Sequence, residues 1–175
     1  SNIPILKNNS DLKLLKDKRF TFGSESSTSG RLMPQHFLLK AGVRTKDLKG
    51  SNAGFSGSHD ATIALVQSGS YEVGALNKQV WDASINKGRV DTKKVKVIWI
   101  SPPYSDYHWL AQGHLDKRFG KGFTNKLKSA FLQFRRTSNN QRKILDLFGA
   151  KKFIPAYSHQ YREIEQIGRS IGKIN

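Results

Sequence analysis

The sequence contains no cysteine, which excludes a disulfide framework, a thiolate metal site and a cysteine nucleophile. It also contains no apolar run that approaches the ~18–20 residues needed to cross a membrane. Residues 1–18 lack the basic region, the apolar region and the small-residue cleavage site of an export signal. We therefore expect either that a signal peptide has been removed or that the chain begins inside a longer protein.

Acidic residues are scarce: 13 Asp and Glu stand against 30 Lys and Arg, so the formal net charge is +17. Such a charge suits a nucleic-acid-binding module, which neutralises phosphates with Lys and Arg. It equally suits a solvated basic surface that attracts small anions over long distances. The basic residues occur as scattered pairs without a row of aromatic residues between them. Nucleic-acid binding is therefore kept as an alternative and not as the main hypothesis.

Short apolar strands alternate with helices over roughly the first 100 residues. Strands are predicted at 19–23, 53–56, 73–76 and 95–100, and helices at about 32–41, 58–69 and 77–88. Ser58 and Asn77 are suitable N-caps for the second and third helices, and Ser101-Pro102-Pro103 ends the last strand. This alternation is typical of an α/β fold with a mainly parallel sheet.

Beyond Pro103 the pattern predicts one further strand at 108–112 and three amphipathic helices. The first helix carries an apolar stripe of Phe119, Phe123, Leu127, Phe131 and Phe134, which we interpret as core. The second helix starts where Ser138 and Gln141 have capping-box spacing, and the third begins at Ser158. Such helices need a sheet to pack against, so we expect that chain outside this sequence supplies it.

The loop from Glu25 to Gly30 lies between a predicted strand and a predicted helix. A helix N-terminus at the carboxyl end of a parallel strand offers free N–H groups and a positive dipole end, both suited to an anion. Ser27, Thr28 and Ser29 add three hydroxyl donors, and Gly30 allows close backbone approach. The alternative is a flexible surface loop that simply caps the helix.

Two more polar residues are predicted at the same edge of the sheet. His59 falls in the first turn of the helix that follows the second strand. Asp106 follows the stiff Pro102-Pro103 connection. A carboxylate beside a bound anion is repulsive unless a proton lies between them, so Asp106 is a candidate acceptor of a hydrogen bond from a P–OH group. The alternative is that Asp106 only helps to form a turn.

The segments SSTSG, FSGSHDATIALV, VGALNKQVWD, VKVIWISPPYSDYHW and ILDLFGAKKFIPA together resemble the phosphate/phosphite/phosphonate-binding proteins of ABC transporters, the PhnD-like family. The motifs occur in the family's order from about Leu15 to the end of the chain. The resemblance implies a type II periplasmic-binding-protein fold with two α/β lobes that clamp an oxyanion between them.

The resemblance also implies the division of the chain. Residues 1–14 would lead into the hinge, 15–98 would form the second lobe and 99–107 would return through the hinge. Residues 108–175 would then complete the first lobe, whose N-terminal half is not in this sequence.

Carried over by position, the resemblance implies that Ser27, Thr28, Ser29, His59 and Asp106 contact the ligand. Residues expected to support them are Ser26, Gly30, Ser58, Gln79 and Tyr107. Relatives that take aminoalkylphosphonates carry an acid near position 79, where this chain has Gln79. The expected ligand is therefore phosphite, methylphosphonate or another phosphonate without an amine.

The resemblance thus predicts the substrate-binding component of an ABC importer, located in the periplasm and delivering its ligand to an inner-membrane permease. We expect a monomer when complete, with no catalytic residues, cofactor, metal ion or nucleic-acid partner. Besides the nucleic-acid alternative, a truncated piece without independent activity remains open.

Overall fold

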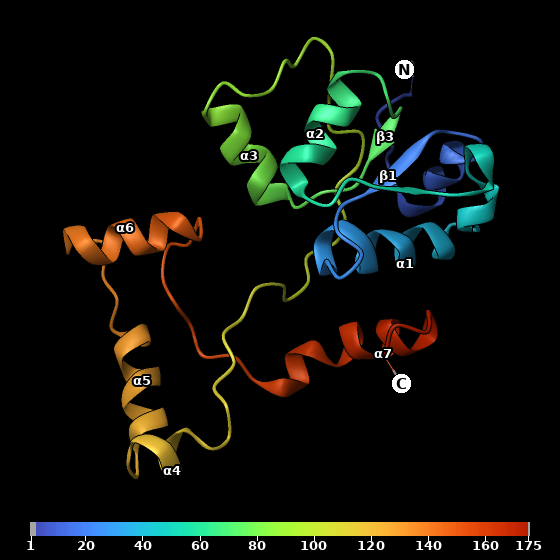
Figure 1. Ribbon diagram of the computed structural model, residues 1–175. Helices are drawn as coiled ribbons and strands as arrows, with labels where there is room; N and C mark the ends of the chain where they lie inside the picture. Colours follow the sequence, from blue (N-terminus) through green and yellow to red (C-terminus); the bar gives the residue numbers. More distant parts are fainter. Residues whose placement is uncertain (1–2, 175) are drawn as a thin grey trace. The chain divides into compact units, whose positions relative to one another are not determined.

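Figure 1 shows the chain as a computed structural model that describes residues 3–174. These residues divide into two compact units, which are considered separately. The first unit contains the described residues up to Asp106 and from Arg162 onward, and the second contains Tyr107–Tyr161. The lobe boundaries expected from the sequence stay predictions. Within the described part of the chain, every helix is too short or too polar to cross a lipid bilayer.

The first unit is built on three short parallel strands, β1 (Phe20–Phe22), β2 (Gly54–Phe55) and β3 (Val73–Gly74). Their order is β2-β1-β3, with Thr21 opposite Gly54 on one side and Phe20 opposite Val73 on the other. The central strand β1 is buried throughout, as expected for a parallel sheet covered on both faces. The predicted parallel α/β sheet is confirmed.

Helices follow each of these strands. Those of the first unit are α1 (Met33–Lys40), α2 (His59–Gln67), α3 (Lys78–Asn86) and α7 (Arg162–Ser170). A π-helical turn, η2 (Thr28–Leu32), precedes α1, and 3-10 turns form η1 (Asn9–Leu15), η3 (Thr45–Asp47) and η4 (Lys49–Ser51). The predicted caps are confirmed: Ser58 Oγ accepts from Ala61 N at 3.1 Å, and Asn77 Oδ1 accepts from Gln79 N at 2.8 Å.

The core of the first unit gathers around β1 and α1. Phe22 is completely buried, and Phe37 of α1 meets the edge of Trp99 with ring centroids 5.2 Å apart. From the far part of the chain, α7 contributes the buried Ile167 and runs alongside α1 (Figure 1). Burial of large apolar side chains is the main favourable term in folding, so this cluster holds the sheet and its helices in place.

The second unit contains α4 (Leu115–Phe119), α5 (Phe123–Leu132), α6 (Asn139–Leu147) and the 3-10 turn η5 (Ser158–Tyr161). Aromatic rings pack among these elements, for example Phe131 with Trp109 at 5.2 Å and with Phe153 at 5.1 Å. The predicted aromatic stripe therefore does contribute packing. The single helix expected for it is wrong, because Gly120 and Gly122 have positive φ values of 98° and 84° and divide it into α4 and α5.

Three further local predictions are wrong. Residues 95–100 and 108–112 are not strands, because among the described residues neither segment joins the three-stranded sheet. The first of these segments accepts a backbone hydrogen bond at Ile98 O, from Leu6 N at 2.8 Å. The capping box at Ser138 does not form, since Gln141 Oε1 accepts instead from Arg135 N at 2.7 Å.

Candidate functional site

The Ser-Thr-Ser loop leaves β1 and turns directly into η2. Ser27 caps this helical turn, its Oγ accepting from Gly30 N at 2.9 Å. Gly23 N donates to Gly30 O at 2.8 Å, which closes the loop onto the end of β1. The first N–H groups of a helix have no acceptor within the helix, so the backbone at Thr28 and Ser29 presents donors at the positive end of the helical dipole.

His59 lies at the first position of α2, immediately beside this loop. A Cβ atom placed on Gly30 would lie 3.1 Å from His59 Cε1, and one placed on Gly23 would lie 3.7 Å from His59 Nδ1. Gly57 N also donates to Gly23 O at 3.3 Å, which ties the start of α2 to the end of β1. The structure therefore places the Ser-Thr-Ser loop and His59 at one edge of the sheet, as predicted.

Asn77 follows β3 and connects these groups. Its Nδ2 donates to Ser29 Oγ at 3.3 Å and to Asp106 Oδ2 at 3.0 Å. Its backbone N–H donates to His59 Nδ1 at 3.4 Å. The residue is 8% exposed, so these contacts are largely shielded from water. Sequence reasoning assigned Asn77 only a capping role.

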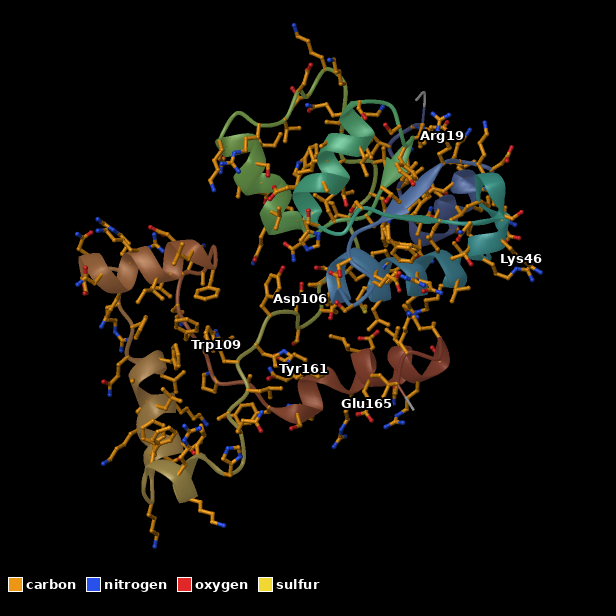
Figure 2. All side chains as sticks on the ribbon, viewed as in Figure 1. Arg19, Lys46, Asp106, Trp109, Tyr161 and Glu165 are labelled. Carbon is orange, nitrogen blue, oxygen red and sulfur yellow. The ribbon has the colours of Figure 1, made fainter. Side chains whose placement is uncertain are left out.

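Six residues thus meet where the three strands end; we call them the strand-end cluster. Contacts join Ser27, Ser29, His59, Asn77 and Asp106, and the sixth residue, Thr28, lies between Ser27 and Ser29 at the start of η2. Figure 2 labels Asp106 in the segment that follows the two prolines. The cluster combines hydroxyl and amide donors with one carboxylate, which is a set suited to a protonated tetrahedral oxyanion.

The supporting residues predicted from the sequence lie in different places. Ser26 is exposed and its Oγ is 3.2 Å from Ser24 Oγ, while Ser58 caps α2. Gln79 is exposed in the first turn of α3. Tyr107 belongs to the second unit and is 67% exposed. Gly30, in contrast, forms the contact between the loop and His59 described above.

Burial governs the charge state of His59. Desolvation lowers the pKa of the His59 imidazole below its ordinary value, and the nearby carboxylates of Asp106 and Asp60 oppose that shift. The neutral imidazole is therefore favoured, in agreement with the hydrogen bond that Nδ1 accepts from Asn77. A neutral histidine has one ring nitrogen as acceptor and the other as donor.

Arg31 is a second residue that sequence reasoning missed. It lies in η2 with 8% of its surface exposed, and its guanidinium carbon is 4.5 Å from the centre of the Phe22 ring and 5.2 Å from that of Phe55. Burial lowers the pKa of Arg31, an effect opposed by Glu25, but a guanidinium keeps its charge in proteins. Arg31 thus adds a fixed positive charge to the helical turn that begins at Thr28.

A sequence model of one protein family, described as "ABC transporter, phosphonate, periplasmic substrate-binding protein", matches residues 4–161. The chain belongs to this family. The resemblance drawn from its motifs is therefore confirmed, and with it the α/β class of the fold.

Two comparisons with individual proteins agree with this membership. The chain is 56% identical over 169 residues to the probable ABC transporter phosphite binding protein PhnD1 of Prochlorococcus marinus (strain MIT 9301). That match covers 97% of this chain but only 57% of the relative, so the chain spans little more than half of the relative's length. The 1.52 Å structure of PhnD1 from Prochlorococcus marinus (MIT 9301) in complex with methylphosphonate superposes with a TM-score of 0.92 at 55% identity. It is matched over 98% of this chain and 63% of its own.

Family membership does not by itself assign a role to each side chain. The structure brings Ser27, Thr28, Ser29, His59 and Asp106 together with Asn77. That the first five contact a ligand stays a prediction. The same rule that located His59, that the carboxyl ends of parallel strands share an edge, also applies to Asn77, because it follows β3.

Proposed function

We propose that this chain supplies the oxyanion-binding lobe of a periplasmic substrate-binding component of an ABC importer. The ligand would be phosphite, methylphosphonate or another small phosphonate. The observation that carries the proposal is the strand-end cluster, in which the Ser-Thr-Ser helix start, His59 and the Asn77–Asp106 pair lie at one edge of the sheet. Family membership and a relative solved with methylphosphonate support it.

The chemistry of the cluster favours a singly protonated oxyanion. Hydroxyls and backbone N–H groups around Thr28 donate to P–O oxygens, and Arg31 contributes positive potential. Asp106 repels a bare phosphorus oxyanion but accepts a hydrogen bond from a P–OH group. Gln79, at the first turn of α3, carries no charge to pair with a ligand amine, so an amino-substituted phosphonate is not the expected ligand.

The proposed activity is capture without chemical change. The oxyanion binds, the lobes close about the hinge, and the closed form delivers the ligand to a permease in the inner membrane. The protein would act as a monomer in the periplasm, and it would be neither an enzyme nor a nucleic-acid-binding protein. The charge of +17 then serves to attract an anionic ligand.

Isothermal titration of the protein in its natural full length tests this proposal. Phosphite, methylphosphonate and phosphate are titrated separately, with sulfate as a control anion that carries no proton at neutral pH. We expect heat and saturable binding with phosphite or methylphosphonate. Absence of binding to all three phosphorus oxyanions would remove the proposal.

Two variants assign the binding to the strand-end cluster. Thr28→Ala and His59→Ala each remove one hydrogen bond to a charged ligand, so we expect about 10- to 100-fold weaker binding from each. Thr45→Ala is the matched control, because Thr45 begins the short helical turn η3 just as Thr28 begins η2. Unchanged affinity in both Thr28→Ala and His59→Ala would show that the ligand binds elsewhere.

A further inference from the structure

Asn77 is the residue to which the other polar groups of the strand-end cluster connect. Three hydrogen bonds join it to residues from three separate segments: Ser29 after β1, His59 after β2, and Asp106 after the two prolines. Asn77 itself follows β3. Because it is 8% exposed, water competes little for these contacts. The orientation of Asn77 therefore affects the positions of Ser29, His59 and Asp106.

The cap of α3 fixes which way the Asn77 amide points. Oδ1 accepts from Gln79 N at 2.8 Å and from Val80 N at 3.4 Å, so the oxygen must face the helix. The NH2 group consequently faces the opposite way, toward Ser29 and Asp106. An asparagine side chain has one acceptor oxygen and one nitrogen with two donor hydrogens. Exchanging the two atoms would lose the hydrogen bonds to Gln79, Val80 and Asp106, so the orientation of the amide is determined.

The amide in turn fixes the hydrogen of Ser29. Ser29 Oγ accepts a hydrogen bond from Asn77 Nδ2, so its own hydroxyl hydrogen must point to a different partner. Asp106 receives the other N–H of the same group at Oδ2 and is held as an acceptor. One neutral side chain thus places a hydroxyl donor and a carboxylate acceptor next to each other.

The backbone of Asn77 fixes the tautomer of His59. Asn77 N–H donates to Nδ1, so Nδ1 carries the lone pair and the ring proton sits on Nε2. A proton on Nδ1 would place two donors face to face and break this contact. His59 therefore presents Nε2–H as a donor.

We propose that Asn77 is the positioning residue of the oxyanion site: it aims the donors of Ser29 and His59 and holds Asp106 as the acceptor. The inference rests on the proposed function for the identity of the ligand. The resulting pattern of two donors beside one acceptor matches a tetrahedral phosphorus oxyanion that carries one proton. Asn77 acts through its neighbours and not by contact with the ligand.

The variant Asn77→Ser separates positioning from simple structural support. Serine is as good an N-cap as asparagine, so α3 keeps its cap while the bridging NH2 group is lost. Asn8→Ser is the matched control, because Asn8 caps η1 through the same kind of side-chain contact, Asp11 N to Oδ1 at 3.2 Å. In the full-length protein we expect Asn8→Ser to melt like the wild type and Asn77→Ser to melt at a lower temperature, because only the latter loses two largely buried hydrogen bonds; both are compared well below their melting temperatures.

Titration with methylphosphonate then gives the deciding comparison. We expect Asn77→Ser to bind about 10-fold or more weakly, since a hydrogen bond to the Asp106 carboxylate and one to Ser29 are lost, and Asn8→Ser to bind like the wild type. Equal affinity in Asn77→Ser and the wild type would overturn the inference while leaving the proposed function intact.

Nitrogen-15 NMR of the His59 ring in the ligand-free full-length protein supplies a readout that does not depend on binding. The expected spectrum is that of a neutral ring protonated at Nε2, retained in Asn77→Ser because the backbone N–H remains. A ring protonated at Nδ1, or a mixture of tautomers, would overturn the inference even if phosphorus oxyanions bind. If no phosphorus oxyanion binds, the proposed function fails and the role of Asn77 fails with it, whereas a wrong tautomer or equal affinity in Asn77→Ser removes the inference alone.

Discussion

A single methyl group at position 30 tests the packing on which the strand-end cluster depends. A Cβ atom at Gly30 would lie 3.0 Å from Ser27 Oγ, 3.1 Å from His59 Cε1 and 3.2 Å from Gly23 Cα. Gly30 is not among the glycines with positive φ, so an alanine there meets no backbone strain. Any loss of stability in Gly30→Ala must therefore come from these three contacts.

The size of the effect follows from how little the neighbours can move. Gly23 is held by the bond from its N–H to Gly30 O at 2.8 Å and by the bond that its carbonyl accepts from Gly57 N at 3.3 Å. His59 and the Ser27 cap must then shift by a few tenths of an ångström. Overpacking of this kind costs about 1–3 kcal/mol, partly offset by about 0.4–1 kcal/mol from the stiffer unfolded chain. We expect a net loss of about 1–2 kcal/mol in the free energy of unfolding.

Binding should weaken as well, because a displaced His59 no longer aims its ring at the ligand; a tenfold loss corresponds to about 1.4 kcal/mol. Chemical denaturation and titration with methylphosphonate measure the two effects separately. Gly113→Ala is the control, since nothing lies within 4 Å of a Cβ there and its φ is not positive. If Gly30→Ala matches Gly113→Ala in stability and in affinity, the close contact between the loop and His59 is refuted.

The remaining predictions concern stability. Because burial lowers the pKa of His59, its contribution to stability is fully present above the unfolded pKa of about 6.5 and is lost as the pH falls through the lowered pKa. We expect the wild type to lose stability from pH 7 toward pH 5 more steeply than His59→Gln, by at most about 1.4 kcal/mol per pH unit; parallel denaturation curves would contradict this. Gly74→Ala should lower the free energy of unfolding by about 3 kcal/mol in total, more than Gly30→Ala, since its Cβ would lie 2.5 Å from Thr62 Cγ2. A melting temperature equal to that of the wild type would show that β3 can shift to make room for the methyl group.

The alternation of strands and helices in the first unit was predictable because each boundary has a local cause. Ser58 and Asn77 cap α2 and α3 as expected, and the buried run at β1 forms the central strand. The edge rule for parallel strands also predicts that His59 lies beside the Ser-Thr-Ser loop. These features depend on residues that are close in sequence, or on a rule of topology.

Some of the predictions that were wrong depend on contacts between distant residues. The apolar segment at 95–100 has the pattern of a strand, but strand formation requires a neighbour with a matching ladder. The cluster role of Asn77 was missed for the same reason, because its partners Ser29 and Asp106 are 48 and 29 positions away. The long aromatic helix, in contrast, fails for a local reason: Gly120 and Gly122 have positive φ values, and Asp116 secures their turn by accepting from Gly122 N at 2.9 Å.

The packing of α7 against α1 has a consequence for the order in which the protein forms. During ribosomal synthesis α1 emerges well before Ile167, which belongs to the same apolar cluster. Until then the part of the cluster under Ile167 has no cover, and a long loop must close before α7 can supply it. The first unit therefore reaches its final packing only after α7 has been made.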